Sequence, residues 1–121
     1  MKYDLKERLI KFAVLIVKLV KAMSSDYTGK HFGGQLLRSG SSPALNYGEA
    51  LGAESQADFI HKMSNCLKEL RETEVNLEII DLSNLTDSTL VETARKECDE
   101  LVAIFVKSVS TARKNKDSRK R

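Results

Sequence analysis

Apolar residues recur at helical spacing near the start of the chain. Their intervals of three and four residues place them on one face of a helix, and they are Leu5, Leu9, Phe12, Ala13, Ile16, Val20 and Met23. Asp4, followed by Glu7 three residues later, provides a cap for the start of this helix.

The same helix carries four more apolar residues outside that face, namely Val14, Leu15, Val17 and Leu19. A helix that is apolar on more than one side must bury more than a single seam, in the centre of a bundle or against another chain. These four residues are therefore our candidates for an oligomer interface.

A second helix is predicted from about Lys30 or His31 to Leu51, after a loop at residues 24–29. It contains several glycines and the only proline of the chain, Pro43, which lacks an amide donor. We expect a kink or short break around residues 40–43, where small side chains also allow a neighbouring helix to approach closely.

The third and fourth helices have clearer patterns. Ser55 is the expected cap of the third, whose buried seam holds Phe59, Met63, Cys66, Leu67, Leu70, Leu77 and Ile80. A turn at residues 81–88 ends with Thr86 or Thr89 as the expected cap of the fourth. That helix is predicted to run to Arg113, with Leu90, Ala94, Cys98, Leu101, Val102, Phe105 and Val109 facing inward.

Four helices joined by short loops, with no strand pattern between them, predict an all-α fold. The expected architecture is an antiparallel up-down four-helix bundle at residues 1–113, with a kinked second helix, followed by a disordered basic tail at residues 114–121. The 121 residues suit one domain, and the 41% hydrophobic and 31% charged content is typical of a globular protein rather than a disordered or membrane chain.

Charge is distributed unevenly. Residues 1–38 hold eight basic and three acidic residues, residues 39–112 hold six and thirteen, and residues 113–121 hold six and one. The ends of the chain are thus the places to look for a polyanionic partner. The candidate nucleic-acid-binding residues are those of the tail, Arg113, Lys114, Lys116, Arg119, Lys120 and Arg121; a merely solubilising tail is an equal alternative.

Targeting and redox signals are weak. Lysines at 11, 18 and 21 interrupt the apolar stretch of the first helix, so it predicts neither a signal peptide nor a membrane span. Cys66 and Cys98 fit small buried residues better than a disulfide or a metal site. We expect a cytoplasmic protein.

Over about residues 3–114, and most specifically from Arg38 to Thr73, the sequence resembles the bacterial four-helix-bundle family named for proteins encoded in intervening sequences of 23S ribosomal RNA genes. The resemblance rests on the segments RSGSS at 38–42, NYGEA at 46–50, AES at 53–55, ADFIHK at 57–62 and LKELRET at 67–73. It implies an up-down bundle that assembles as a ring, commonly a pentamer, without known enzymatic activity. Related ring-forming bundles are accessory proteins that contact nucleic acid or a nucleic-acid enzyme, and family members are often called ribosomal.

The chain departs from the family pattern at three places. They are Pro43, where Ile or Val is usual; Leu45, where Ala is usual; and residues 74–76, where an aromatic-rich stretch is common.

Candidate chemistry is sparse. Asp58 and His61 lie one helical turn apart, but nothing around His31, the only other histidine, resembles a second half-site. We predict no metal, cofactor, catalytic residue or small-molecule substrate, and assign Asp58 to the helix start. A structural polar network is expected instead, in which Arg38 reaches Glu69 or Glu72; Asn46 and Glu49 are further candidates for it.

These observations favour a non-enzymatic, self-assembling bundle that acts as an accessory protein for RNA or DNA, or in a ribosome-related role. The alternative is a protein-interaction scaffold without a nucleic-acid role.

Overall fold

Four α-helices make up the fold. The computed structural model describes residues 4–119, and of Arg119 only the backbone. The helices are α1 (Leu5–Lys21), α2 (Tyr27–Leu51), α3 (Gln56–Leu82) and α4 (Ser88–Arg119).

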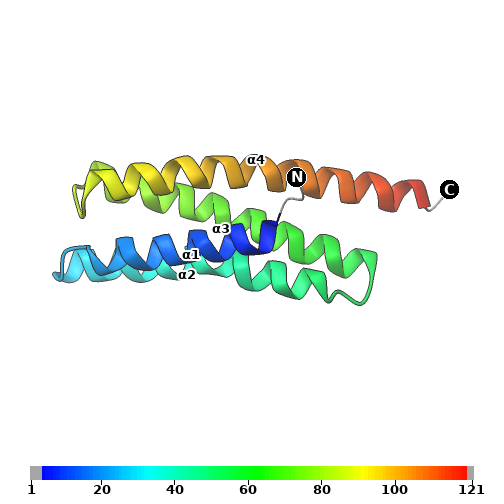
Figure 1. Cartoon of the computed structure of the whole chain (residues 1–121), viewed down its shortest axis with the longest axis horizontal. Coiled ribbons are helices and arrows are strands. Elements are labelled where there is room, and N and C mark those ends of the chain that lie inside the picture. Colours follow the sequence, from blue (N-terminus) through cyan, green and yellow to red (C-terminus); the bar gives the residue numbers. More distant parts are fainter. Residues whose placement is uncertain (1–3, 120–121) are drawn as a thin grey trace.

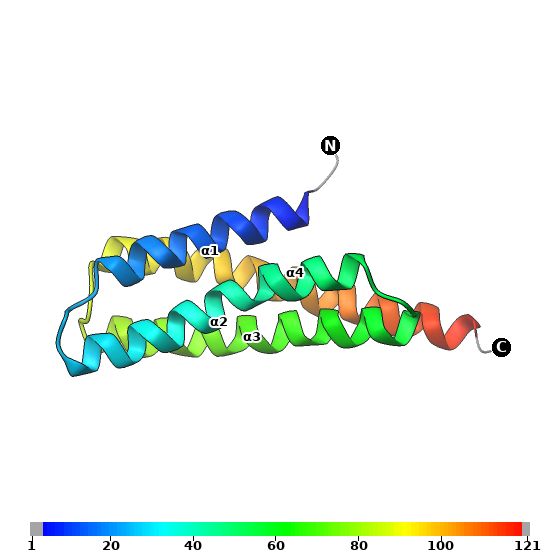
Figure 2. The ribbon, with the colours of Figure 1, turned by 90° about the horizontal axis from the view of Figure 1, so that it is seen from below.

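Each helix packs against its neighbours in sequence, and α1 also packs against α4. This arrangement confirms the predicted up-down bundle (Figure 1). The α1–α2 and α3–α4 loops meet at one end, where the amide of Ser24 donates to the carbonyl of Leu85 over 3.1 Å. At the opposite end α4 projects beyond the α2–α3 loop (Figures 1 and 2).

One continuous core fills the space between the helices. Its largest fully buried side chains include Leu9, Phe12, Ile16, Leu36, Leu70, Leu77, Ile80, Leu101 and Phe105. Burying such a side chain contributes roughly 1.5–3 kcal/mol each. Thr73 and Asn76 are buried polar exceptions on α3. Thr73 donates to the Glu69 carbonyl over 2.8 Å, and Asn76 donates to Ser39 Oγ over 3.2 Å.

Short polar side chains cap the helix starts. Asp4 and Ser55 accept from the amides of Glu7 and Asp58, each over 3.0 Å, as predicted. Asp26 accepts from the Gly29 amide over 2.9 Å, which lets α2 begin three residues before the expected Lys30.

The cap of α4 differs from the prediction. The side chain of Asp87, rather than of Thr86 or Thr89, accepts from the Thr89 amide over 2.7 Å. A carboxylate adds favourable charge at a helix N-terminus, which a threonine hydroxyl does not.

Of the kink or short break expected in α2, the break is absent, because α2 runs through Pro43 without interruption. Figure 2 shows that α2 nevertheless changes direction near its middle. The predicted close approach occurs at Gly40, where an added Cβ would lie 2.7 Å from Ile16 Cγ1. Only glycine therefore lets α1 and α2 pack at this separation.

The end of α4 also differs from the prediction. Residues 114–119, expected to be disordered, continue the helix. Residues 113–118 contain neither Gly nor Pro, and their lysines and arginine are good helix formers. Lys120 and Arg121 lie outside the described residues.

Candidate nucleic-acid interface

Arg38 of α2 joins two carboxylates of α3, as predicted. Its guanidinium lies 3.0 Å from Glu69 Oε2 and 2.6 Å from Glu72 Oε2. The hydrogen bond from Arg38 lowers the pKa of Glu72, whereas burial raises the pKa of Glu69. Arg38 thus connects two helices at a site where one carboxylate is partly buried.

The other two candidates for this network lie apart from it. Asn46 donates to the carbonyl of Ser42 within α2 over 3.1 Å. Glu49 pairs instead with Lys62 of α3 at 3.2 Å. Of the five residues predicted for this network, three are joined in the structure, namely Arg38, Glu69 and Glu72.

A basic groove runs between α3 and α4 toward the projecting end of α4. It consists of two adjoining hollows of about 370 Å³ each, which share Leu67, Arg71, Val109 and Arg113. Ser64 and Lys68 line one hollow; Val106, Ser110, Lys114 and Asp117 line the other. The groove thus has an apolar floor and four cationic side chains against one carboxylate.

None of these four cations forms an ion pair within the described residues. Arg113 donates only to Ser64 Oγ, over 3.4 Å. Arg71 lies near enough to Glu74 to oppose the rise in that carboxyl's pKa, but does not pair with it. The groove therefore offers charge that the bundle does not neutralise.

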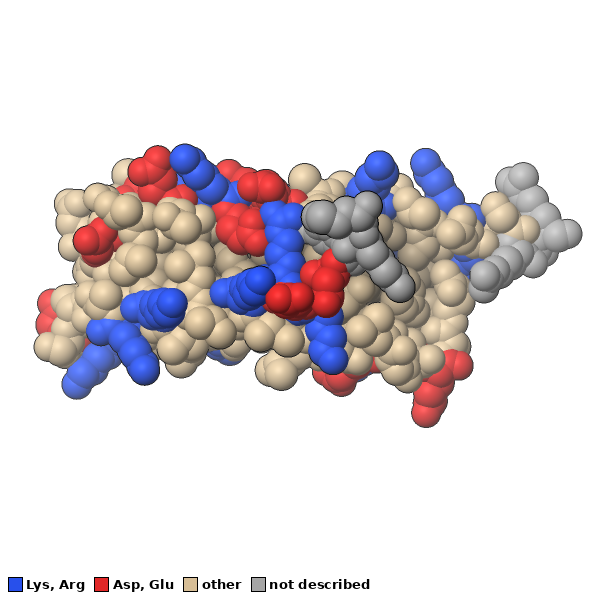
Figure 3. Space-filling model, in the orientation of Figure 1, with Lys and Arg blue, Asp and Glu red and all other residues tan. Residues whose placement is uncertain are grey.

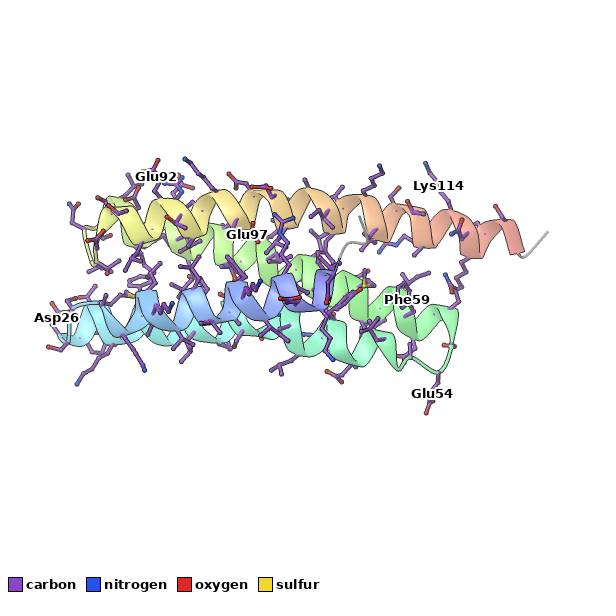
Figure 4. The ribbon with its side chains drawn as sticks, in the orientation of Figure 1. Asp26, Glu54, Phe59, Glu92, Glu97 and Lys114 are labelled. Atoms are coloured by element: carbon purple, nitrogen blue, oxygen red, sulfur yellow. The ribbon has the colours of Figure 1, made fainter. Side chains whose placement is uncertain are left out.

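The candidate nucleic-acid-binding residues of the tail have different positions in the structure. Arg113 and Lys114 line the groove, and Figure 4 shows Lys114 pointing away from the bundle. Lys116 is half-buried on the same helix. The side chain of Arg119, and all of Lys120 and Arg121, lie outside the described residues.

Sequence reasoning missed Lys68 and Arg71 as members of this groove. They lie one helical turn apart on α3, on a face whose charge pattern predicts only exposure to solvent. Their spacing was a signal in the sequence, since residues three apart share a helix face. Assigning them to a groove also requires the register of α3 against α4.

The opposite half of the α3–α4 seam is acidic. Arg95 pairs with Asp81 at 3.0 Å, and Glu74 faces Asp99. Burial and the hydrogen bond with Asp99 raise the pKa of Glu74. Figure 3 shows acidic side chains gathered over this part of α4.

The four interface candidates of α1 have different environments. Leu19 is fully buried within the chain, which contradicts its assignment to an oligomer interface. It faces the core because it lies one turn beyond Ile16. Leu15 and Val17 are half-buried, and Val14 is 49% exposed.

The remaining candidate chemistry serves the fold. Asp58 also accepts from the Glu54 amide over 3.4 Å, completing the cap of α3. Burial raises the pKa of Cys66 and of Cys98 to about 12, so both thiols are poor nucleophiles at neutral pH.

Among the described residues, no three His, Cys, Asp or Glu side chains lie together in a way that could hold a metal ion. No helix in residues 4–119 combines the length and apolar character needed to cross a membrane.

Comparison with known proteins places this geometry in a family. Residues 1–107 match the family model described as 23S rRNA-intervening sequence protein. The chain belongs to this family. No curated protein matches it.

A solved structure from the same group of proteins supports membership in the 23S rRNA-intervening sequence protein family. It is the crystal structure of a protein with unknown function from the S23 ribosomal protein family of Bacteroides thetaiotaomicron VPI-5482. The two chains share 32% sequence identity with a TM-score of 0.81, over 88% of this chain and 98% of the other.

One departure from the family pattern, Leu45, lies on the surface, and the departure at residues 74–76 does so in part, because Asn76 is buried. Leu45 is 68% exposed on α2, and Val75, in the middle of residues 74–76, is 56% exposed on α3. Pro43, by contrast, is buried. In this member of the family, the departures at Leu45 and Val75 thus alter the surface rather than the core.

Proposed function

We propose that this protein is a non-enzymatic accessory protein that self-assembles and binds nucleic acid, RNA foremost, through the basic groove. Its place of action would be the cytoplasm.

The observation that carries the proposal is the pair of arginines facing one groove without carboxylate partners. Phosphate oxygens are the ligands that an arginine fork binds best. Lys68 and Lys114 add charge on either side, and the hydroxyls of Ser64 and Ser110 provide further donors. The groove lacks aromatic side chains, so we expect binding to the backbone rather than stacking on bases.

Self-assembly would strengthen such binding. The apolar residues exposed on α1 and α2 support a ring-like homo-oligomer, for which a pentamer is our working expectation. Several copies would present several grooves and several α4 ends to one strand, which raises the overall affinity without new contacts.

The test compares two double variants of the same type and charge. Arg71→Gln/Arg113→Gln removes the unpaired arginines, and Arg38→Gln/Arg95→Gln removes two paired ones. RNA and DNA binding is measured at two salt concentrations. We expect the first variant to lower the log–log salt slope by about 0.9 for each duplex phosphate that it no longer binds, or about 0.7 for a single strand. The second, once light scattering shows that it assembles like wild type, should also bind like wild type.

Equal losses in both variants would show that only net charge matters and would refute a groove site. Absence of binding by the wild-type protein at low salt would instead favour the protein-interaction scaffold. The exposed apolar residues of α1, α2 and α3 are the observation that supports this second candidate.

A further inference from the structure

We propose that the α1–α2 face of one copy docks onto the outer side of α3 in a second copy, in a head-to-tail contact. This inference rests on the self-assembly in the proposed function and specifies which surfaces meet. It is carried by two separate apolar surfaces of opposite charge.

The first surface, here called the α1–α2 face, combines exposed residues of two helices. Ile10 and Val14 are 47% and 49% exposed on α1, and Leu37 and Leu45 are 40% and 68% exposed on α2. Ile16 meets Gly40 of α2, and each residue turns about 100° around a helix. This rotation places three residues on the outward side of α1: Val17, Ile10 and Val14.

The second surface, here called the α3 stripe, lies on one helix. Val75, Ile79 and Leu82 recur at intervals of four and three residues and are 56%, 37% and 75% exposed. Their spacing places them in one row on the outer side of α3. The exposed carboxylate of Glu78 lies beside this row, and so does that of Glu72, which already pairs with Arg38.

The charges around these surfaces are opposite. Around the α1–α2 face, Lys18, Lys21 and Lys30 form no ion pair within the described residues, whereas the other basic residues of 8–38 are paired within the chain. In residues 72–100, which contain the α3 stripe, four carboxylates form no ion pair within the described residues, namely Glu74, Glu78, Asp87 and Asp99. In Figure 3 acidic side chains gather over the loop-end half of α4, whereas lysines and arginines predominate over the α1–α2 side below it.

This charge distribution favours unlike surfaces meeting. Two α1–α2 faces in contact would place like charges together, which is unfavourable, whereas an α1–α2 face on an α3 stripe pairs positive with negative. The α3 stripe and most of the α1–α2 face lie in the half of the bundle that holds the joined loops, with Leu45 beyond the middle of α2, and the two surfaces belong to different helix hairpins. Successive copies can therefore dock at the same level, and such a head-to-tail contact closes into a ring if the rotation permits.

The test uses one blocked surface per variant. Val14→Glu places a carboxylate on the α1–α2 face, where it would oppose the acidic stripe; Val75→Lys places a cation on the stripe, where it would oppose the basic face. Both positions are about half exposed, so we expect both variants to fold, as circular dichroism would verify. Leu51→Glu, at a 58% exposed position near the other end of α2, is the matched control.

Light scattering should find each blocked variant alone reduced to the 13.6 kDa chain, while wild type and Leu51→Glu remain assembled. An equal mixture of the two blocked variants should recover complexes of at least twice the chain mass, because each supplies one intact surface.

Assembly by Val75→Lys alone, or no recovery in the mixture, would overturn the head-to-tail contact while leaving self-assembly intact. A monomeric wild-type protein would instead refute the self-assembly on which the inference rests.

Discussion

Two groups of arginines in this bundle differ in their partners. Arg8, Arg38 and Arg95 each bridge to carboxylates on a neighbouring helix, at distances between 2.6 and 3.0 Å. Arg71 and Arg113 line a groove without any ion pair in the described part of the chain. The fold thus uses the first group to connect helices, while the second is available to an outside anion.

The largest effect on binding should follow from deleting residues 113–121. This truncation removes Arg113 and Lys114 from the groove together with four more cations and Asp117. We expect nucleic-acid affinity at low salt to fall by about tenfold or more, and the difference from full length to shrink as salt rises. Filter binding or fluorescence anisotropy at two salt concentrations would measure it; equal affinities would mean that this end of α4 does not take part.

The largest effect on stability should follow from Arg8→Met. The Arg8 guanidinium donates from Nε and Nη2 to Glu97 over 2.7 Å each, and from Nη2 to Glu100 over 3.0 Å, across the α1–α4 seam. Figure 4 shows Glu97 on α4 above α1. Removing these charged hydrogen bonds should cost about 1–3 kcal/mol.

Urea unfolding would show the change as a lower midpoint with an unchanged slope. Arg71→Met is the matched control, because the same substitution there removes no ion pair and should cost roughly 0.5 kcal/mol or less. Similar destabilisation by Arg8→Met and Arg71→Met would contradict the distinction between paired and unpaired arginines.

A smaller effect is expected for Arg38→Met. Half of the Arg38 side chain is exposed, so solvent screens its ion pairs and we expect only a small fall in Tm. Because Arg38 lowers the pKa of Glu72, this stabilisation is present at neutral pH and is lost as the pH falls through that lowered pKa. If Arg38→Met leaves both Tm and assembly unchanged, the network has no structural role.

The sequence predicts these features unequally. The helices can be predicted from the spacing of apolar residues, and the caps of α1 and α3 from Asp4 and Ser55, because both signals are local in the sequence. The contact between Arg38 and the two carboxylates was expected from matching family positions. The basic groove could not be predicted in the same way, because Arg71 and Arg113 are far apart in the chain and meet only through the register of α3 against α4. Likewise, Leu19 looked available for an interface until the packing of α1 placed it in the core.

The smallest effect, and one of opposite sign, is expected for Glu74→Gln in the acidic half of the α3–α4 seam. Burial, then the hydrogen bond and negative charge of Asp99, raise the pKa of Glu74, with Glu78 acting in the same direction and Arg71 opposing it. A raised pKa in the folded state means that wild type loses stability as the pH rises from the unfolded value, about 4.3, through the folded one.

Glutamine at this position carries no charge and can still donate to Asp99. We therefore expect a gain on the order of 0.5 kcal/mol at pH 7, the scale of a like-charge pair on a helix surface. The gain should vanish below about pH 4, where Glu74 is protonated in both states. Melting curves at the two pH values would test this, with Glu54→Gln as control because Figure 4 shows Glu54 pointing away from the bundle. A loss of stability at pH 7 would instead mean that the ionised Glu74 stabilises the seam.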